Sequence, residues 1–185
     1  MRRTMLAAGA AALSAALLLT LATPASADPS HHRTESAADS QLALARAASA
    51  RYHDVGAAIA DGYIPTDDCT ELPGVGGMGY HYINPARLVD GEFDLTRPDI
   101  LLYAPSQDGP RLAGIEFFKP DNDQNLSTDD DRPSLLGQAF DGPMPGHEPG
   151  MPIHYDLHVW LWKSNPNGLF APWNPRVSCP STTLM

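Results

Sequence analysis

The pattern His154-x-Asp156-x-His158 is the part of this sequence whose residue types and spacing are best suited to chemistry. It lies in an alternating segment, 153–162, that predicts a β-strand, and every second side chain of a strand points to the same face. Neutral imidazole nitrogens bind Zn, Cu, Ni and Fe, and a carboxylate completes or orients such a ligand set. The pattern therefore predicts a site for a metal or a small polar ligand. The alternative is the solvent-facing edge of an ordinary strand.

Two tryptophans, Trp160 and Trp162, continue the same predicted face of this strand. Large aromatic side chains beside the histidines favour a lined pocket over an open polar edge. The opposite face is apolar throughout, from Ile153 to Leu161, and is expected to pack on the core.

A second segment, Gly-Ile-Glu116-Phe-Phe, places a carboxylate in a strand that is otherwise suited to burial. Burying an unpaired carboxylate costs several kcal/mol, so Glu116 needs a metal, a cation or hydrogen-bond donors as partners. Arg87, Arg97 and Arg111 are the alternative partners, and a solvent-facing Glu116 is the simplest alternative of all.

His81 follows a glycine-rich run and lies between Tyr80 and Tyr82. If the three segments are neighbours in one sheet, four side chains converge as metal ligands: His81, Glu116, His154 and His158. The expected surroundings of the ion are Asp156, Tyr80, Tyr82, Trp160 and Trp162. A divalent transition metal fits these donors, and the pattern leaves its identity open.

The elements that must position these residues are few. One helix is predicted from Ser36 to about Ala60 by apolar residues three or four apart. Short strands are predicted at 80–83, 100–103, 111–118 and 153–162, with residues 121–150 as a long surface excursion. The predicted fold is α+β, with one N-terminal helix packed on a small antiparallel sheet or partly closed barrel, rich in loops.

The acidic segment 121–131 has oxygen-bearing side chains at alternate positions, as calcium loops do. Leu126 stands where an EF-hand needs glycine, and Arg132 stands where it needs glutamate. We therefore expect a solvated loop here rather than a calcium site.

The chain has 185 residues, with 12 Lys and Arg against 22 Asp and Glu. Its net charge of −10 argues against nucleic-acid binding, which requires a basic face. Residues 1–27 have a basic start, an apolar stretch and an Ala-x-Ala ending, which predict a cleaved export signal. We expect a flexible segment at 28–35, a single globular domain at 36–185, secretion, and no membrane contact after cleavage.

Cys69 and Cys179 are the two cysteines of the chain. In an oxidising compartment they predict one disulfide. Free thiols or a two-cysteine metal site are the alternatives, and the absence of any C-x-x-C spacing disfavours the metal site.

Four motifs of this chain carry a resemblance to a group of proteins: Met-Gly-Tyr80-His81-Tyr, Gly-Ile-Glu116-Phe, His154-Tyr-Asp-Leu-His158 and the ending Trp-Asn-Pro-Arg-Val-Ser-Cys179. With these motifs the chain resembles small exported bacterial proteins of uncharacterised function. This resemblance spans about residues 36–179 and implies export but no particular reaction. There is a fainter similarity to cupins, which gather His and Glu ligands inside a small barrel. The chain lacks the compact H-x-H with a nearby Glu that is typical of cupins.

Three functions are consistent with these patterns. The first is a secreted binding domain whose His/Glu-lined, aromatic-rimmed pocket holds a divalent metal or small polar ligand. The second is a metal-dependent enzyme that uses the same pocket, and the third is a structural or surface-interaction domain without a ligand. The sequence contains no G-x-S-x-G, no H-E-x-x-H and no reactive-cysteine pattern, so it gives no support for a hydrolase of those types.

Overall fold

The computed structural model describes residues 29–147 and 150–180. The expected signal segment, 1–27, lies outside the described residues. Among the described residues, we find no helix with the length and apolarity that crossing a membrane would require.

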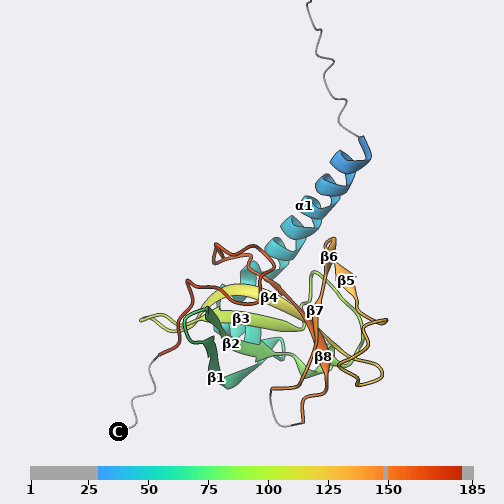
Figure 1. The fold of residues 1–185 in the computed structure, drawn as a ribbon. Helices are drawn as coiled ribbons and strands as arrows, with labels where there is room; N and C mark the ends of the chain where they lie inside the picture. Colours follow the sequence, from blue (N-terminus) through green and yellow to red (C-terminus); the bar gives the residue numbers. More distant parts are fainter. Residues whose placement is uncertain (1–28, 148–149, 181–185) are drawn as a thin grey trace, which may run out of the picture.

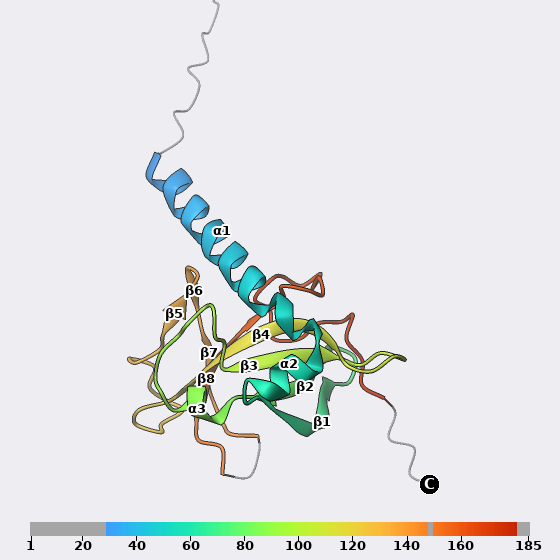
Figure 2. The same cartoon turned by 180° about the vertical axis from the view of Figure 1, so that it is seen from behind.

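The N-terminal helical region consists of three pieces rather than the one predicted helix. Helix α1 spans Pro29–Ser49, a 3₁₀ helix (η1) spans Ala50–His53, and helix α2 spans Val55–Ala60. The break occurs at Asp54, whose backbone is extended and whose side chain caps α2 by accepting a hydrogen bond of 2.8 Å from the Gly56 N–H. As a result, α1 projects from the body while α2 lies across the sheet (Figure 1, Figure 2).

An open antiparallel sheet of six strands forms the body of the protein, in the order β1-β2-β3-β4-β8-β7. Because β1 and β7 are separate edges, the sheet does not close into the barrel considered above. The strands are β1 Ile64–Leu72, β2 Gly76–Ile83, β3 Ile100–Ala104, β4 Arg111–Pro120, β7 Asp141–Met144 and β8 His154–Val159. The remaining elements are helix α3 (Pro85–Leu88) and the small hairpin of β5 (Ser134–Leu135) and β6 (Gln138–Ala139).

The α+β class and the hairpin of β3 and β4 are confirmed. Besides the small β5–β6 hairpin, two strands of the main sheet were not predicted. One is β1, which contains Pro65 and several charged residues, and the other is β7, a short strand inside the expected surface excursion.

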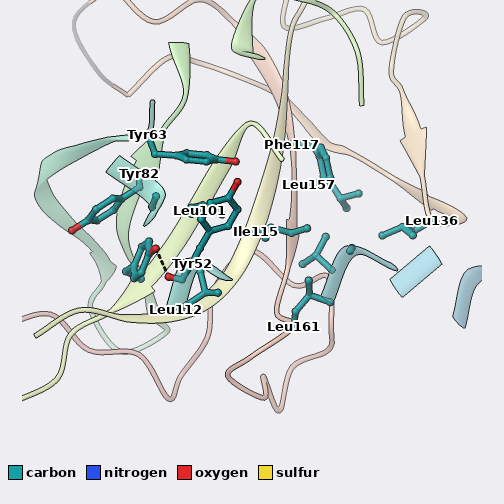
Figure 3. Packing of buried hydrophobic residues seen from close by; sticks show 14 of the residues in the cluster. Tyr52, Tyr63, Tyr82, Leu101, Leu112, Ile115, Phe117, Leu136, Leu157 and Leu161 are labelled. Carbon is teal, nitrogen blue, oxygen red and sulfur yellow. Dashed lines mark hydrogen bonds between the residues drawn. The ribbon is translucent and has the colours of Figure 1, made fainter. Parts of the chain in front are cut away.

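The larger hydrophobic cluster lies between the helices and one face of the sheet. Figure 3 shows it from Tyr63 and Tyr82 at one end to Leu136 at the other. Tyr52 and Ala58 bring η1 and α2 into this cluster, and the Tyr103 hydroxyl donates a 2.6 Å hydrogen bond to the Tyr52 carbonyl. This face of the sheet is therefore fixed to the helical region by both packing and a buried hydrogen bond.

The opposite face carries a smaller cluster that includes Ile100, Leu102, Phe118, Trp160 and Val177. Val177 belongs to the C-terminal segment, which thereby covers part of this face. Both faces of the central strands are buried, and β8 is buried at every position. Polar residues on these strands consequently lie in the interior rather than at a solvent-facing edge.

The predicted disulfide between Cys69 and Cys179 is present, with the two Cα atoms 5.6 Å apart. It joins edge strand β1 to the C-terminal segment. The same segment is held to β2 by reciprocal backbone hydrogen bonds between Gly77 and Asn174, each 3.1 Å long.

Candidate metal site

Three of the four predicted ligands come together: His81 on β2, Glu116 on β4 and His158 on β8. Strand register explains this arrangement. Glu116 lies directly opposite His158, and cross-strand partners project to the same face. His81 lies opposite Leu102 on the intervening strand β3, so its ring must reach across that strand toward Glu116.

The alternation of β4 and β8 explains why the group is buried. Ile115 and Phe117 flank Glu116 and pack in the larger cluster, so the Glu116 side chain points to the opposite face. Leu157 and Val159 flank His158 and also pack in the larger cluster, so the His158 side chain points to the same opposite face as Glu116. The His158 side chain is 1% exposed and that of Glu116 is 6% exposed, whereas His81 is 13% exposed and forms the outer side of the group.

Both histidines place a ring nitrogen near Glu116 Oε2 at a distance expected for neighbouring ligands of one ion. His81 Nε2 lies 3.3 Å from Glu116 Oε2, and His158 Nε2 lies 3.6 Å from the same oxygen. One ligand atom from each residue lies within 4.8 Å of the others. For tetrahedral angles and bonds of about 2.0–2.2 Å, neighbouring donors around Zn²⁺ are about 3.3–3.6 Å apart. Two imidazoles and one carboxylate also form a known zinc ligand set.

Hydrogen bonds do not satisfy the buried donor and acceptor atoms of this group. Glu116 Oε2 and both ring nitrogens of His158 are buried and have no hydrogen-bond partner among the described residues. Charge-assisted N–H···O bonds are normally about 2.7–2.9 Å long, clearly shorter than the separations seen here. Buried polar atoms without partners are rare, so this group needs a further partner, and a cation fits its position.

The arginines considered as partners of Glu116 are all engaged elsewhere. Arg87 donates to the Tyr63 hydroxyl and to the Pro98 carbonyl. Arg97 pairs with Asp94 at 2.7 Å, and Arg111 pairs with Asp108 at 2.9 Å. A salt bridge from these arginines is therefore excluded as the explanation for the buried carboxylate.

The electrostatics of the group show strong coupling between the carboxylate and the imidazoles. Burial alone would raise the pKa of Glu116, but His158 and His81 outweigh it and lower this pKa to about 2. Burial would lower the pKa of His158, but Glu116 and Asp156 outweigh it and raise this pKa to about 9. Without a metal, a proton on His158 thus supplies the positive charge that Glu116 requires.

Asp156 lies on the other side of the His158 ring, with its Oδ1 3.6 Å from His158 Nδ1. A carboxylate at this position favours the tautomer with the proton on Nδ1, which leaves Nε2 as the ligand. The ring of Trp160 is nearly parallel to that of His158, with centroids 6.4 Å apart. Asp156 and Trp160 therefore adjoin the group as expected.

The remaining predicted residues lie elsewhere. His154 is opposite Pro120 at the far end of β8, outside the group of three ligands. Tyr80 and Tyr82 pack with the larger cluster on the other face. Trp162 also packs there, and its indole donates to Ser49 Oγ at 3.2 Å. The structure thus places neither these tyrosines nor Trp162 around the ligands, in contrast to the expected aromatic rim.

Asp141 is a neighbour of the group that the sequence did not predict. It is the cross-strand partner of Asp156, and its pKa is raised by burial and by the Asp156 charge. Its strand, β7, is only four residues long and contains a glycine and a proline, so no periodic pattern reveals it.

Three carboxylates of the acidic loop have partners in the loop or on the adjoining strand β4. Asp121 accepts a 2.8 Å hydrogen bond from the Asn125 N–H, and Asp123 accepts one of 2.8 Å from the Thr128 hydroxyl. Asp131 pairs with Lys119 at 2.5 Å. These three carboxylates therefore have partners among the described residues.

We compared the chain with protein-family models, curated proteins and solved structures, and none of them matches it. The functional conclusions below therefore rest on the geometry and chemistry of the chain itself.

Proposed function

We propose that this protein is a secreted metal-binding domain that holds a divalent transition metal between His81, Glu116 and His158. The observation that carries the proposal is a pair of unpartnered buried atoms: Glu116 Oε2 and His158 Nε2 face one another at a distance suited to metal ligands and too long for a charge-assisted hydrogen bond. Zn²⁺ is the probe that best matches two imidazoles and one carboxylate.

The disulfide and the composition of residues 1–27 support export of the protein. Structural disulfides persist in oxidising compartments and are rare in the cytosol. A secreted domain would meet its metal outside the cytoplasm.

Zinc binding to the purified, disulfide-linked protein tests the proposal. We expect one Zn²⁺ per chain in competition with a chromophoric chelator. His158→Gln and Glu116→Gln should each weaken binding at least 100-fold, because a ligand is lost while the side-chain volume changes little. His53→Gln is the matched control, since His53 is exposed on η1 and contacts the Trp162 ring.

Circular dichroism of the metal-free variants shows whether each one folds. If a buried variant fails to fold, His81→Gln provides the test, because His81 forms the more exposed side of the group. The proposal is overturned if the unmutated protein binds no Zn²⁺, Co²⁺ or Ni²⁺. It is also overturned if folded His81→Gln protein binds the metal as tightly as the unmutated protein.

A second candidate, a metal-dependent enzyme, is favoured by the number of ligands. Three protein ligands leave a fourth position for water on a tetrahedral metal, as catalytic zinc sites do. Replacement by Co²⁺ tests this possibility. An exchangeable water should change the visible spectrum when azide is added, whereas a spectrum insensitive to azide would contradict the enzyme.

A further inference from the structure

The connection between β7 and β8 contains a second group of potential metal donors, with the spacing Met144-x-x-His147-x-x-x-Met151-x-x-His154. Met144 ends β7 and His154 begins β8, so the other two residues lie on the connection between the strands (Figure 1). All four residues lie within the described ranges. None of them belongs to the group of His81, Glu116 and His158.

His154 is the centre of this second group. It is 1% exposed, and its Nδ1 lies 3.0 Å from the Pro152 carbonyl oxygen. Because a carbonyl oxygen only accepts hydrogen bonds, this contact assigns the proton to Nδ1 and leaves a lone pair on Nε2. An imidazole held through Nδ1 by a backbone carbonyl, with a lone pair on Nε2, has the arrangement of a metal-ligating histidine.

His147 and Met144 lie beside this imidazole, and Met151 packs on the cluster whose Phe118 ring stacks on it. The His147 ring lies 5.4 Å from the His154 ring, measured between centroids. Met144 is the cross-strand partner of His154, and such partners share a face of the sheet. Met151 packs against the smaller cluster, which contains Phe118, and the Phe118 ring stacks on His154 with centroids 4.8 Å apart.

Within the described part of this connection, Gly146 lies close to Met151. A Cβ atom on Gly146 would collide with the carbonyl oxygen of Met151, so the backbone before His147 lies directly against the backbone of Met151. Glycine at position 146 permits this approach.

We propose that Met144, His147, Met151 and His154 bind a monovalent copper ion, Cu⁺. Thioether sulfur is a soft donor that selects Cu⁺ over Zn²⁺ or Ca²⁺, and imidazole is compatible with copper. The four donors are uncharged, which suits a monovalent ion better than a divalent one in a partly buried position. His154 and His158 are separated by about 13 Å along β8, so the two groups bind their ions separately.

Cu⁺ titration of the purified protein, with its disulfide intact and preloaded with Zn²⁺, tests this site. Acetonitrile-stabilised Cu⁺ under anaerobic conditions supplies the metal, and a Cu⁺-selective chromophore competes for it. We expect one Cu⁺ per chain, with sulfur and nitrogen neighbours in the copper X-ray absorption spectrum.

Met144→Leu together with Met151→Leu should weaken Cu⁺ binding at least 30-fold and remove the sulfur neighbours. Leucine keeps the apolar volume, so packing is retained. Met78→Leu is the matched control, because Met78 is the remaining described methionine and lies on β2. If the double variant fails to fold, His147→Gln replaces it, because His147 is exposed.

Two results would overturn the copper site: folded Met144→Leu/Met151→Leu protein that binds Cu⁺ as tightly as the unmutated protein, or a copper spectrum without sulfur. Loss of Cu⁺ binding in His158→Gln would also overturn it, because the copper would then occupy the first group. Zn²⁺ binding by the methionine variants is measured in a separate titration. A negative result for the copper site therefore leaves the proposed Zn²⁺ site testable, and the reverse also holds.

Discussion

Glu116 is a carboxylate flanked by Ile115 and Phe117, and its surroundings limit what it can do. An isolated charge at such a position costs several kcal/mol, so the residue requires a positive neighbour. His158 provides that charge as an imidazolium when no metal is present. A divalent ion would displace this proton and replace one positive charge with two. On the proposed function, the residue would couple metal uptake to proton release.

Asp99 is a second buried carboxylate, and it gives a prediction at the residue scale. It is 1% exposed, its Oδ2 accepts a 2.9 Å hydrogen bond from the Phe118 N–H, and its Oδ1 has no described partner. Burial raises the pKa of Asp99 to about 7, above its ordinary value of 3.8. The folded protein therefore binds a proton that the unfolded chain releases between about pH 4 and pH 7. Stability should fall as the pH rises through this window.

Asp99→Asn should remove that pH dependence, because an amide does not titrate. We expect the variant to be more stable than the unmutated protein at pH 7.5, by up to on the order of 4 kcal/mol. Urea unfolding of metal-free protein at pH 5 and pH 7.5 measures the difference. Equal slopes of stability against pH in the two proteins would show that Asp99 is ionised in the fold.

At the scale of elements, β8 shows how far sequence reasoning extends. Its alternation predicted a strand with histidines on one face, and the structure confirms the strand and the shared face. The predicted ligand set was wrong in including His154 together with His158, because of the distance between them. His154 and His158 are four residues apart, which corresponds to about 13 Å along a strand, so both cannot bind the same ion.

The register between strands is the information that the sequence lacks. Glu116 lies opposite His158 because β4 pairs with β8 across a long connection, and no local pattern specifies that pairing. Trp160 adjoins the group, but Trp162 lies outside it for a related reason. β8 ends at Val159, so the strict alternation that placed Trp162 beside the histidines does not continue to it.

Strand β2 positions His81, and Gly79 determines how closely it approaches β3. Gly79 has a φ of +88°, and a Cβ at this position would collide with the Tyr103 carbonyl oxygen. Gly79→Ala should therefore destabilise the fold by at least ~2 kcal/mol and weaken Zn²⁺ binding, because β2 must move away from β3. Thermal unfolding and chelator competition measure the two effects.

Gly74→Ala is the control for this prediction. Gly74 has a similar φ of +78°, but a Cβ there would meet nothing within 4 Å. Gly74→Ala should lower the free energy of unfolding only by the backbone strain, about 1–2 kcal/mol, and leave metal binding unchanged. Equal losses of stability in both variants would show that the contact with Tyr103 does not matter.

At the scale of the whole molecule, the Cys69–Cys179 disulfide closes the chain from within β1 to the C-terminal segment into one loop that contains strands β2 to β8. The two cysteines are 110 residues apart in the sequence. In the chain-entropy model, a loop of this length stabilises the folded state by about 4–5 kcal/mol.

Cys69→Ala together with Cys179→Ala should lower the free energy of unfolding by about that amount, measured in urea. The C-terminal segment keeps its backbone contacts with β2 through Gly77 and Asn174, so the variant should retain the native fold. The fully reduced unmutated protein should match the variant. A loss below about 1 kcal/mol would contradict the entropic account.

The distribution of the first ligand group over β2, β4 and β8 has a consequence for how the proposed site would acquire an ion. A nascent or translocating polypeptide has no preformed coordination sphere, because the sphere exists only after distant strands have joined. A protein exported before folding would therefore load outside the cell, and the metals available in the medium, rather than those of the cytoplasm, would determine its occupancy.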